Sequence, residues 1–235
     1  MKRHAFAWGA GLLCAAFLAG QVVAQEKPAK KEEKKEPAKS GTQEPARGHE
    51  GQMTPEQQAE REAWAKAAQP GPEHKLLDYM VGAWDVNGKF WMSPEDEPTP
   101  ISGTSDAKWI LGGRFVHYVF KGDDPEHAFE GSGCTGYDNI QKKYISIWMD
   151  TEMTGWVTDV GTYDAAAKTF TYTGEFRTPM GQTVKSRSTI KLVSNDEHVL
   201  TMYHTKPGQK ENRVMELVYK RAGTVSKPPP PKQSP

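Results

Sequence analysis

Apolar and polar residues alternate along the central part of the chain. Ten successive segments of about ten residues show this period of two and are rich in Val, Ile, Thr, Tyr, Phe and Trp. They cover residues 83–92, 101–111, 114–121, 128–138, 143–150, 155–164, 168–177, 183–194, 198–206 and 212–221. A period of two is the signature of strands that bury one face, so the pattern predicts ten β-strands.

The segments are separated by short runs of turn-forming residues, such as Gly112-Gly113 and Gly122–His127. None of these connections is long enough to hold a helical crossover, so neighbouring strands are expected to pair antiparallel. Ten strands joined in this way close most naturally into a barrel, which leaves no exposed sheet edge. The prediction is an all-β fold: an antiparallel up-and-down β-barrel.

A helical pattern precedes the strands. Thr54 is suited to the N-cap of a helix, Pro55 to its first position, and Gln57 lies three residues after the cap. The run Pro70-Gly71-Pro72 ends this helix, and a second short helix over 73–80 leads into Gly82. We therefore predict a helical leader over residues 54–71 and a barrel domain over residues 72–222.

The ends of the chain have a different composition. Residues 1–24 combine Lys2 and Arg3 with an apolar middle and small residues near Ala24, which predicts a signal peptide cleaved after Ala24. Residues 25–53 are mostly Lys, Glu, Pro and Ala, typical of a disordered linker, and residues 223–235 form a Pro-rich tail. The expected location is periplasmic or secreted, with no transmembrane span in the mature protein.

Charge and cysteine content narrow the function classes. Residues 72–222 contain 21 acidic and 17 basic side chains, a net charge of −4, which argues against nucleic acid as a partner. After removal of the signal peptide, Cys134 is the one remaining cysteine, so the domain is expected to depend on packing and not on a disulfide.

The strand faces indicate what the barrel encloses. In 143–150, Tyr144, Ser146, Trp148 and Asp150 share one face, and in 168–177 Phe170, Tyr172, Gly174 and Phe176 do so. Such faces mix large aromatic rings with isolated polar groups, which a solid core would tolerate only if each polar group found a partner. A ligand cavity would accommodate them.

Five sequence blocks, in order, carry a resemblance to a known family: HKLLDYMVGAWDV, WILGGRFV, GCTGYDNIQKKYISIWMDTEMTG, GTYDAAAKTF and VMELVYKR. The chain resembles, over about residues 72–222, the bacterial family of unknown function DUF1579, which is grouped with the lipocalin-like (calycin) barrels. The resemblance implies a calycin-like barrel with a cavity, and no established activity. It also implies that Gly82 and Trp84 close the barrel floor, with Arg213 or Arg221 from the last strand packed over the tryptophan.

Several residues are candidates for the cavity wall because they place an aromatic or an ionisable group on a strand of the barrel. These candidates are Trp109, His117, Trp148, Asp150, Trp156, Arg187, Tyr203 and Glu216. For Arg187 and Glu216, the alternative is that they pair with each other across the barrel, since buried ionisable groups more often satisfy one another than act in catalysis.

Other chemistry finds little support in the sequence. Gly131, Gly133 and Gly136 have the spacing of a dinucleotide fingerprint, but a hairpin follows where that motif needs a helix. His198 and His204 are too far apart along one strand to share a metal ion, so we expect neither a metal nor a cofactor. His117 or His204 as a lone axial haem ligand remains an alternative.

Three functions remain open at this point. The leading hypothesis is an exported protein that binds a small hydrophobic or amphipathic ligand. The second is a barrel enzyme that pairs Asp150 or Glu216 with His117 or His204 as acid and base. The third is a non-catalytic envelope module that makes contacts through residues 25–71 and 223–235.

Overall fold

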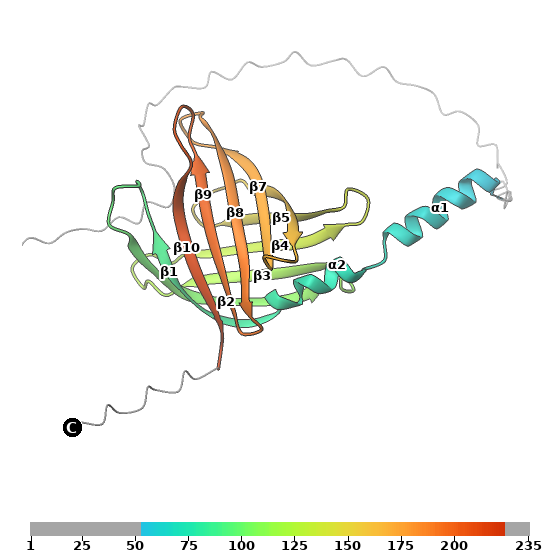
Figure 1. Cartoon of the computed structure of the whole chain (residues 1–235), viewed down its shortest axis with the longest axis horizontal. Helices are drawn as coiled ribbons and strands as arrows, with labels where there is room; N and C mark the ends of the chain where they lie inside the picture. The colour runs from blue at the N-terminus through green and yellow to red at the C-terminus, as the bar shows by residue number, and fades with distance from the viewer. Residues whose placement is uncertain (1–52, 224–235) are drawn as a thin grey trace, which may run out of the picture. The chain divides into compact units, whose positions relative to one another are not determined.

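The computed structural model describes residues 53–223, and the ten predicted strands are all present (Figure 1). The strands are β1 (Gly82–Phe90), β2 (Thr99–Ile110), β3 (Phe115–Gly122), β4 (Glu130–Asp138), β5 (Lys143–Asp150), β6 (Val157–Asp164), β7 (Thr169–Arg177), β8 (Thr183–Ser194), β9 (Glu197–Thr205) and β10 (Asn212–Arg221). Each differs from its predicted range by at most two residues at either end, and β5, β8 and β10 coincide with their predicted ranges.

Every strand pairs antiparallel with its neighbours in sequence, and β1 also pairs with β10, which closes the barrel. The predicted all-β fold is therefore confirmed. Closure matters physically because it pairs the backbone groups that an open sheet would leave at its two edges.

Short helical segments lead into the first strand. α2 (Pro72–Lys75) is followed by the 3-10 helix η1 (Leu76–Met80), where the sequence predicted one continuous helix. Leu77 of η1 is fully buried among the barrel residues, so η1 covers one end of the barrel. We call this end the floor, and the opposite end, where β1 ends and β2 begins, the far end.

The helix α1 (Pro55–Ala67) has the predicted N-terminus. The backbone N–H of Gln57 donates to Thr54 Oγ1, and the backbone N–H of Thr54 donates to Gln57 Oε1, which together form a capping box. The helix has no buried residue. Within residues 53–223, no helix is long and apolar enough to cross a membrane. The predicted signal peptide, nearly all of the linker and the tail beyond Gly223 lie outside the described residues.

Alternation along each strand separates an inner face from an outer face. The predicted faces of β5 and β7 are confirmed, with Tyr144, Phe170 and Tyr172 buried inside. In β10 the alternation breaks, because a bulge between Arg213 and Met215 shifts the register against β9. Arg213 and Met215, which strict alternation would place on one face, therefore lie on opposite faces of the barrel wall.

Candidate functional site

The floor is built around Trp84, which is only 2% exposed. Its Nε1–H donates to the carbonyl of Met80 at 2.7 Å, and the Arg221 guanidinium lies 4.3 Å from the centre of its ring. Arg221 also donates to the carbonyls of Val81 and Asn195, at 3.0 and 2.9 Å. These contacts connect the first strand, the last strand and η1.

Gly82 makes this arrangement possible. Its φ of +119° is unfavourable for any residue with a side chain, and a Cβ there would lie 2.6 Å from Arg221 Nη1. The place of Gly82 and Trp84 at the closed end thus agrees with the expectation drawn from the resemblance, and Arg221 is the basic residue that covers the tryptophan.

Arg213, the other basic residue considered for the floor, lies elsewhere. The bulge in β10 pairs it with Tyr203, and its guanidinium lies 4.3 Å from the ring centre of Trp91, just beyond the end of β1. Arg213 Nη1 also donates to Glu216 Oε2 at 2.9 Å. Arg213 is therefore at the far end of the barrel, and its proposed role in closing the floor is wrong.

Polar groups without partners gather inside the barrel above the floor. Four buried side-chain atoms have no hydrogen-bond partner among the described residues: Tyr79 Oη, Asp159 Oδ1, Tyr172 Oη and His198 Nδ1. We call these four residues the inner polar cluster. Buried polar atoms are nearly always paired in folded proteins, so four orphans in one interior are unusual.

Asp159 is the charged member of the inner polar cluster. It lies on β6 beside Ser146 of β5 and Gly174 of β7, and a Cβ at position 174 would collide with its Oδ1. Glycine at 174 thus leaves the space that the carboxyl occupies. Burial raises the pKa of Asp159, because the ionised carboxylate loses hydration inside the barrel.

Tyr118 lies close to this carboxyl and has partners of its own. Its hydroxyl and Ser146 Oγ are 3.2 Å apart, and Thr135 Oγ1 donates to the same Ser146 oxygen at 3.2 Å. Burial is the main cause that raises the pKa of Tyr118, and the charge of Asp159 adds to the effect. The phenol therefore remains a protonated hydroxyl, able to donate or accept a hydrogen bond.

Two further tyrosines of the interior behave in the same way. Burial raises the pKa of Tyr79 and Tyr172, and nearby phenols strengthen the shift in both cases. The charge of Asp159 contributes at Tyr172 as well. The interior thus contains neutral hydroxyl groups around the Asp159 carboxyl.

His198 connects the inner polar cluster to the floor. Its ring stacks on Tyr219 at 4.5 Å between centroids and meets Trp84 edge-on at 4.5 Å. Burial lowers the pKa of His198 to about 3, and the charge of Arg221 acts in the same direction. The imidazole is therefore neutral at physiological pH.

Two tryptophans predicted to line the cavity face the interior. Trp148 stacks on Tyr118 with centroids 5.9 Å apart, and its Nε1–H donates to Asp150 Oδ2 at 2.8 Å. Trp109 packs against the floor, where its Nε1–H donates to Asp78 Oδ1 at 2.8 Å. Trp148 and Asp150 thus belong to the interior, while Trp109 belongs to the floor.

The other predicted cavity residues do not face the interior. Arg187 makes a two-pronged ion pair with Glu211, with N–O distances of 2.8 and 2.6 Å, and its guanidinium lies 4.0 Å from the ring centre of Tyr203. Arg187 and Tyr203 both lie on the outer face. Ser186 and Ser188, on either side of Arg187, point inward, as does His204, next to Tyr203. Glu216 pairs with Arg213 and not with Arg187, so the predicted pair across the barrel is wrong.

His117 and Trp156 also lie outside. His117 Nε2 is 2.9 Å from Ser132 Oγ, on the face opposite to that of its buried neighbour Val116. Trp156 lies in the loop before β6 and is 72% exposed. Since His117 and Glu216 are outside the barrel, the acid–base pairs that include either residue are excluded.

The remaining histidine, His204, is inside and packs edge-on against Phe176 at 5.1 Å. Burial lowers its pKa, and the charge of Lys206 adds to this.

No group of three or more His, Cys, Asp or Glu side chains within residues 53–223 is arranged to hold a metal ion. Gly131, one of the three glycines with the spacing of a dinucleotide fingerprint, lies beneath the Trp148 ring and leaves room for it.

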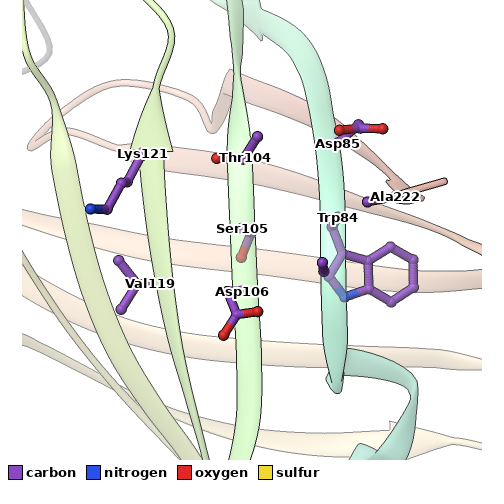
Figure 2. A pocket seen from close by; sticks show the side chains of 9 residues that line it. Trp84, Asp85, Thr104, Ser105, Asp106, Val119, Lys121 and Ala222 are labelled. Carbon is purple, nitrogen blue, oxygen red and sulfur yellow. The ribbon is translucent and has the colours of Figure 1, made fainter.

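A shallow depression of about 270 Å³ lies across β1, β2 and β3 (Figure 2). Asp85, Asp106 and Lys121 contribute its charged side chains. Lys121 already pairs with Glu130 at 3.3 Å. These groups do not converge on a common point in Figure 2, so we regard the inner polar cluster as the candidate site.

Sequence reasoning missed most of the inner polar cluster. A signal for Asp159 was present, since it is the one carboxylate on the β6 face that also carries Val157, Gly161 and Tyr163. Nothing in the sequence indicates that Tyr79, Tyr172 and His198 would lack hydrogen-bond partners among the described residues. That property depends on which groups lie opposite them in the closed barrel.

Comparison with known proteins gives the following. No curated protein matches the sequence significantly. Among solved structures, Rv2717c from M. tuberculosis matches with a TM-score of 0.47 and 14% identity, over 65% of this chain and 99% of that one. The S-type phycobiliprotein lyase CPES from Guillardia theta matches with a TM-score of 0.44 and 9% identity, over 67% and 96%. The family model described as "Protein of unknown function (DUF1579)" matches residues 69–221, and the chain therefore belongs to the DUF1579 family.

Proposed function

We propose that this protein is exported and binds a small, partly apolar molecule inside its barrel. The observation that carries the proposal is the inner polar cluster, in which four buried polar atoms have no partner among the described residues. Leaving a polar group buried and unpaired costs roughly 1–3 kcal/mol. A bound molecule that pairs with these atoms would remove that cost.

The surroundings of the cluster support an amphipathic ligand. Trp148, Tyr118 and Tyr219 face the interior but are only half-buried, whereas Trp84 and Phe170 at the floor are fully buried. The interior is therefore packed less completely above the floor. Aromatic walls with a few convergent polar groups are the usual composition of a small-molecule site.

The binding proposal is tested with the protein purified from its own host. We expect native mass spectrometry to show a retained small molecule, and its removal to change the fluorescence of Trp148. Tyr172→Phe removes one unpaired hydroxyl and should weaken rebinding by up to about tenfold, in line with one hydrogen bond.

Tyr203→Phe is the matched control, since that hydroxyl lies on the outer face. The proposal is wrong if no molecule is retained and if Tyr172→Phe and Tyr203→Phe respond alike to every compound in a library of small aromatic and aliphatic ligands.

Export rests on the composition of residues 1–24, with a basic tip and an apolar middle. Cell fractionation, with N-terminal sequencing of the mature protein, should locate it in the periplasm or medium with cleavage after Ala24. A full-length protein retained in the cytoplasm would contradict this part of the proposal and leave the binding site unaffected.

A further inference from the structure

The charged side chains that face the interior have an uneven distribution. Asp150 and Asp159 are carboxylates on adjacent strands, and both face inward above the floor. Arg221 is the inward-facing cation at the floor, where Trp84, Asp196 and two backbone carbonyls surround it. No lysine lies on the inner face among the described strands.

The histidines do not change this balance. His198 is neutral because burial lowers its pKa to about 3, and burial also lowers the pKa of His204. The space above the floor is therefore electronegative. An anionic ligand, such as a fatty acid, would meet carboxylates there without a basic side chain to neutralise it.

Asp159 has the geometry of a recognition group. Its Oδ1 is buried and has no hydrogen-bond partner among the described residues, although two serine or threonine hydroxyls lie nearby in the Tyr118 network. A carboxylate oxygen accepts hydrogen bonds only, so the missing partner is a donor. A charged donor would gain most, because it also compensates the buried negative charge.

Aromatic rings lie close to the same point. The charge of Asp159 acts on both Tyr118 and Tyr172, and Tyr118 stacks on Trp148. The faces of tyrosine and tryptophan rings attract cations, and the attraction increases when water is excluded. A carboxylate between aromatic rings is the arrangement that recognises an amine.

From these observations we propose that the barrel interior selects a small aromatic or aliphatic amine, whose protonated nitrogen pairs with Asp159 among the rings of Tyr118, Tyr172 and Trp148. This inference rests on the proposed binding function and names the chemical class of its ligand. It does not extend to the outer depression, where Asp85 and Asp106 are exposed and which Tyr118, Tyr172 and Trp148 do not line.

The test uses two probes that share the same dansyl group and alkyl chain: dansylcadaverine, whose primary amine is charged, and its N-acetyl derivative, in which that nitrogen is a neutral amide. We expect the wild-type protein to bind the amine at least about tenfold more tightly, which corresponds to one charge-assisted hydrogen bond. The Asp159→Asn variant should lose this preference but still bind both probes. Asp159→Glu, which retains the charge, should restore part of it.

Asp106→Asn is the matched control, because this carboxylate is on the outer face and should leave the preference unchanged. The wild-type protein provides a test without any substitution: affinity for the amine should decrease as the pH falls through the pKa of Asp159, and affinity for the N-acetyl probe should not. Equal affinities in the wild type, or a preference that survives Asp159→Asn, would overturn the amine proposal alone. If neither probe binds the wild type and no molecule is retained from the host, the binding function itself fails.

Discussion

The floor and the inner polar cluster are neighbours, but the polar groups of the floor have hydrogen-bond partners and the named atoms of the cluster have none among the described residues. At the floor, the Trp84 indole N–H, the Trp109 indole N–H and the Arg221 guanidinium all have hydrogen-bond partners. Next to it, His198 and Tyr79 contact each other through their rings, while Tyr79 Oη and His198 Nδ1 have no hydrogen-bond partner within residues 53–223. The difference indicates that the floor stabilises the barrel, whereas the cluster retains bonding capacity at a cost in stability.

The largest effect is expected from Trp84→Ala. This change removes a fully buried indole and the ring under Arg221, and it should reduce the free energy of unfolding by about 3–5 kcal/mol. Urea denaturation measures the change. Trp156→Ala, at an exposed position, should stay within about 0.5 kcal/mol of the wild type. Similar losses from the two substitutions would show that the floor has no special role.

The two arginines of β10 sharpen the comparison. Arg221→Ala breaks contacts with Trp84, Val81 and Asn195 and should destabilise the protein by about 2–3 kcal/mol. Arg213→Ala removes a ring contact and an exposed ion pair, and should cost less than about 1 kcal/mol. The same urea titrations compare them, and an equal cost would contradict the assignment of Arg221 to the floor.

His198, between the two regions, should make the free energy of unfolding depend on pH. Its pKa is about 3 in the folded protein and close to 6.5 when unfolded. Its contribution is therefore complete above pH 6.5 and is lost as the pH falls toward 3, by about 2 kcal/mol at pH 5. His198→Phe retains an aromatic ring and should flatten this part of the stability curve measured from pH 8 to pH 4. An unchanged slope would mean that His198 is protonated in the folded state.

The smallest effect, of opposite sign, is expected at Asp159. Because its pKa is raised in the folded state, ionisation of this carboxyl destabilises the fold as the pH rises through that pKa. Asp159→Asn should therefore increase the Tm by about 2–4 °C at pH 8 and have little effect at pH 4, without added ligand. A decrease in Tm at pH 8 would place Asp159 among the residues that stabilise the barrel, as at the floor.

Local chemistry explains which parts of the site were predictable. Trp148 and Asp150 are two residues apart on one strand, so they necessarily share a face, and they do form a hydrogen bond. Arg187 and Glu216 lie on β8 and β10, which are not neighbours, and their faces depend on the register of the strand between them. The predicted pair failed for this reason, and Glu211 takes the place of Glu216 as the partner of Arg187.

The position of Arg213 was also unpredictable from the sequence, because it depends on the bulge in β10. Strict alternation would place Arg213 on the face of Met215 and Leu217, but one extra residue in the strand puts it on the opposite face. No residue type in the segment signals a bulge, since Val214 is an ordinary strand residue. Only pairing with β9 reveals it.

The amino-acid sequence by itself determined ten strands, their antiparallel order and the helical segments before them, because these depend on alternation, turn residues and contacts between chain neighbours. The expected place of Gly82 and Trp84 at the floor came from the family resemblance. The tertiary structure alone decided which ionisable groups face inward and which buried polar atoms lack partners. Those properties depend on strand register and on the closure of β1 against β10, which brings together residues far apart in the chain. The inner polar cluster therefore emerges only when the barrel closes.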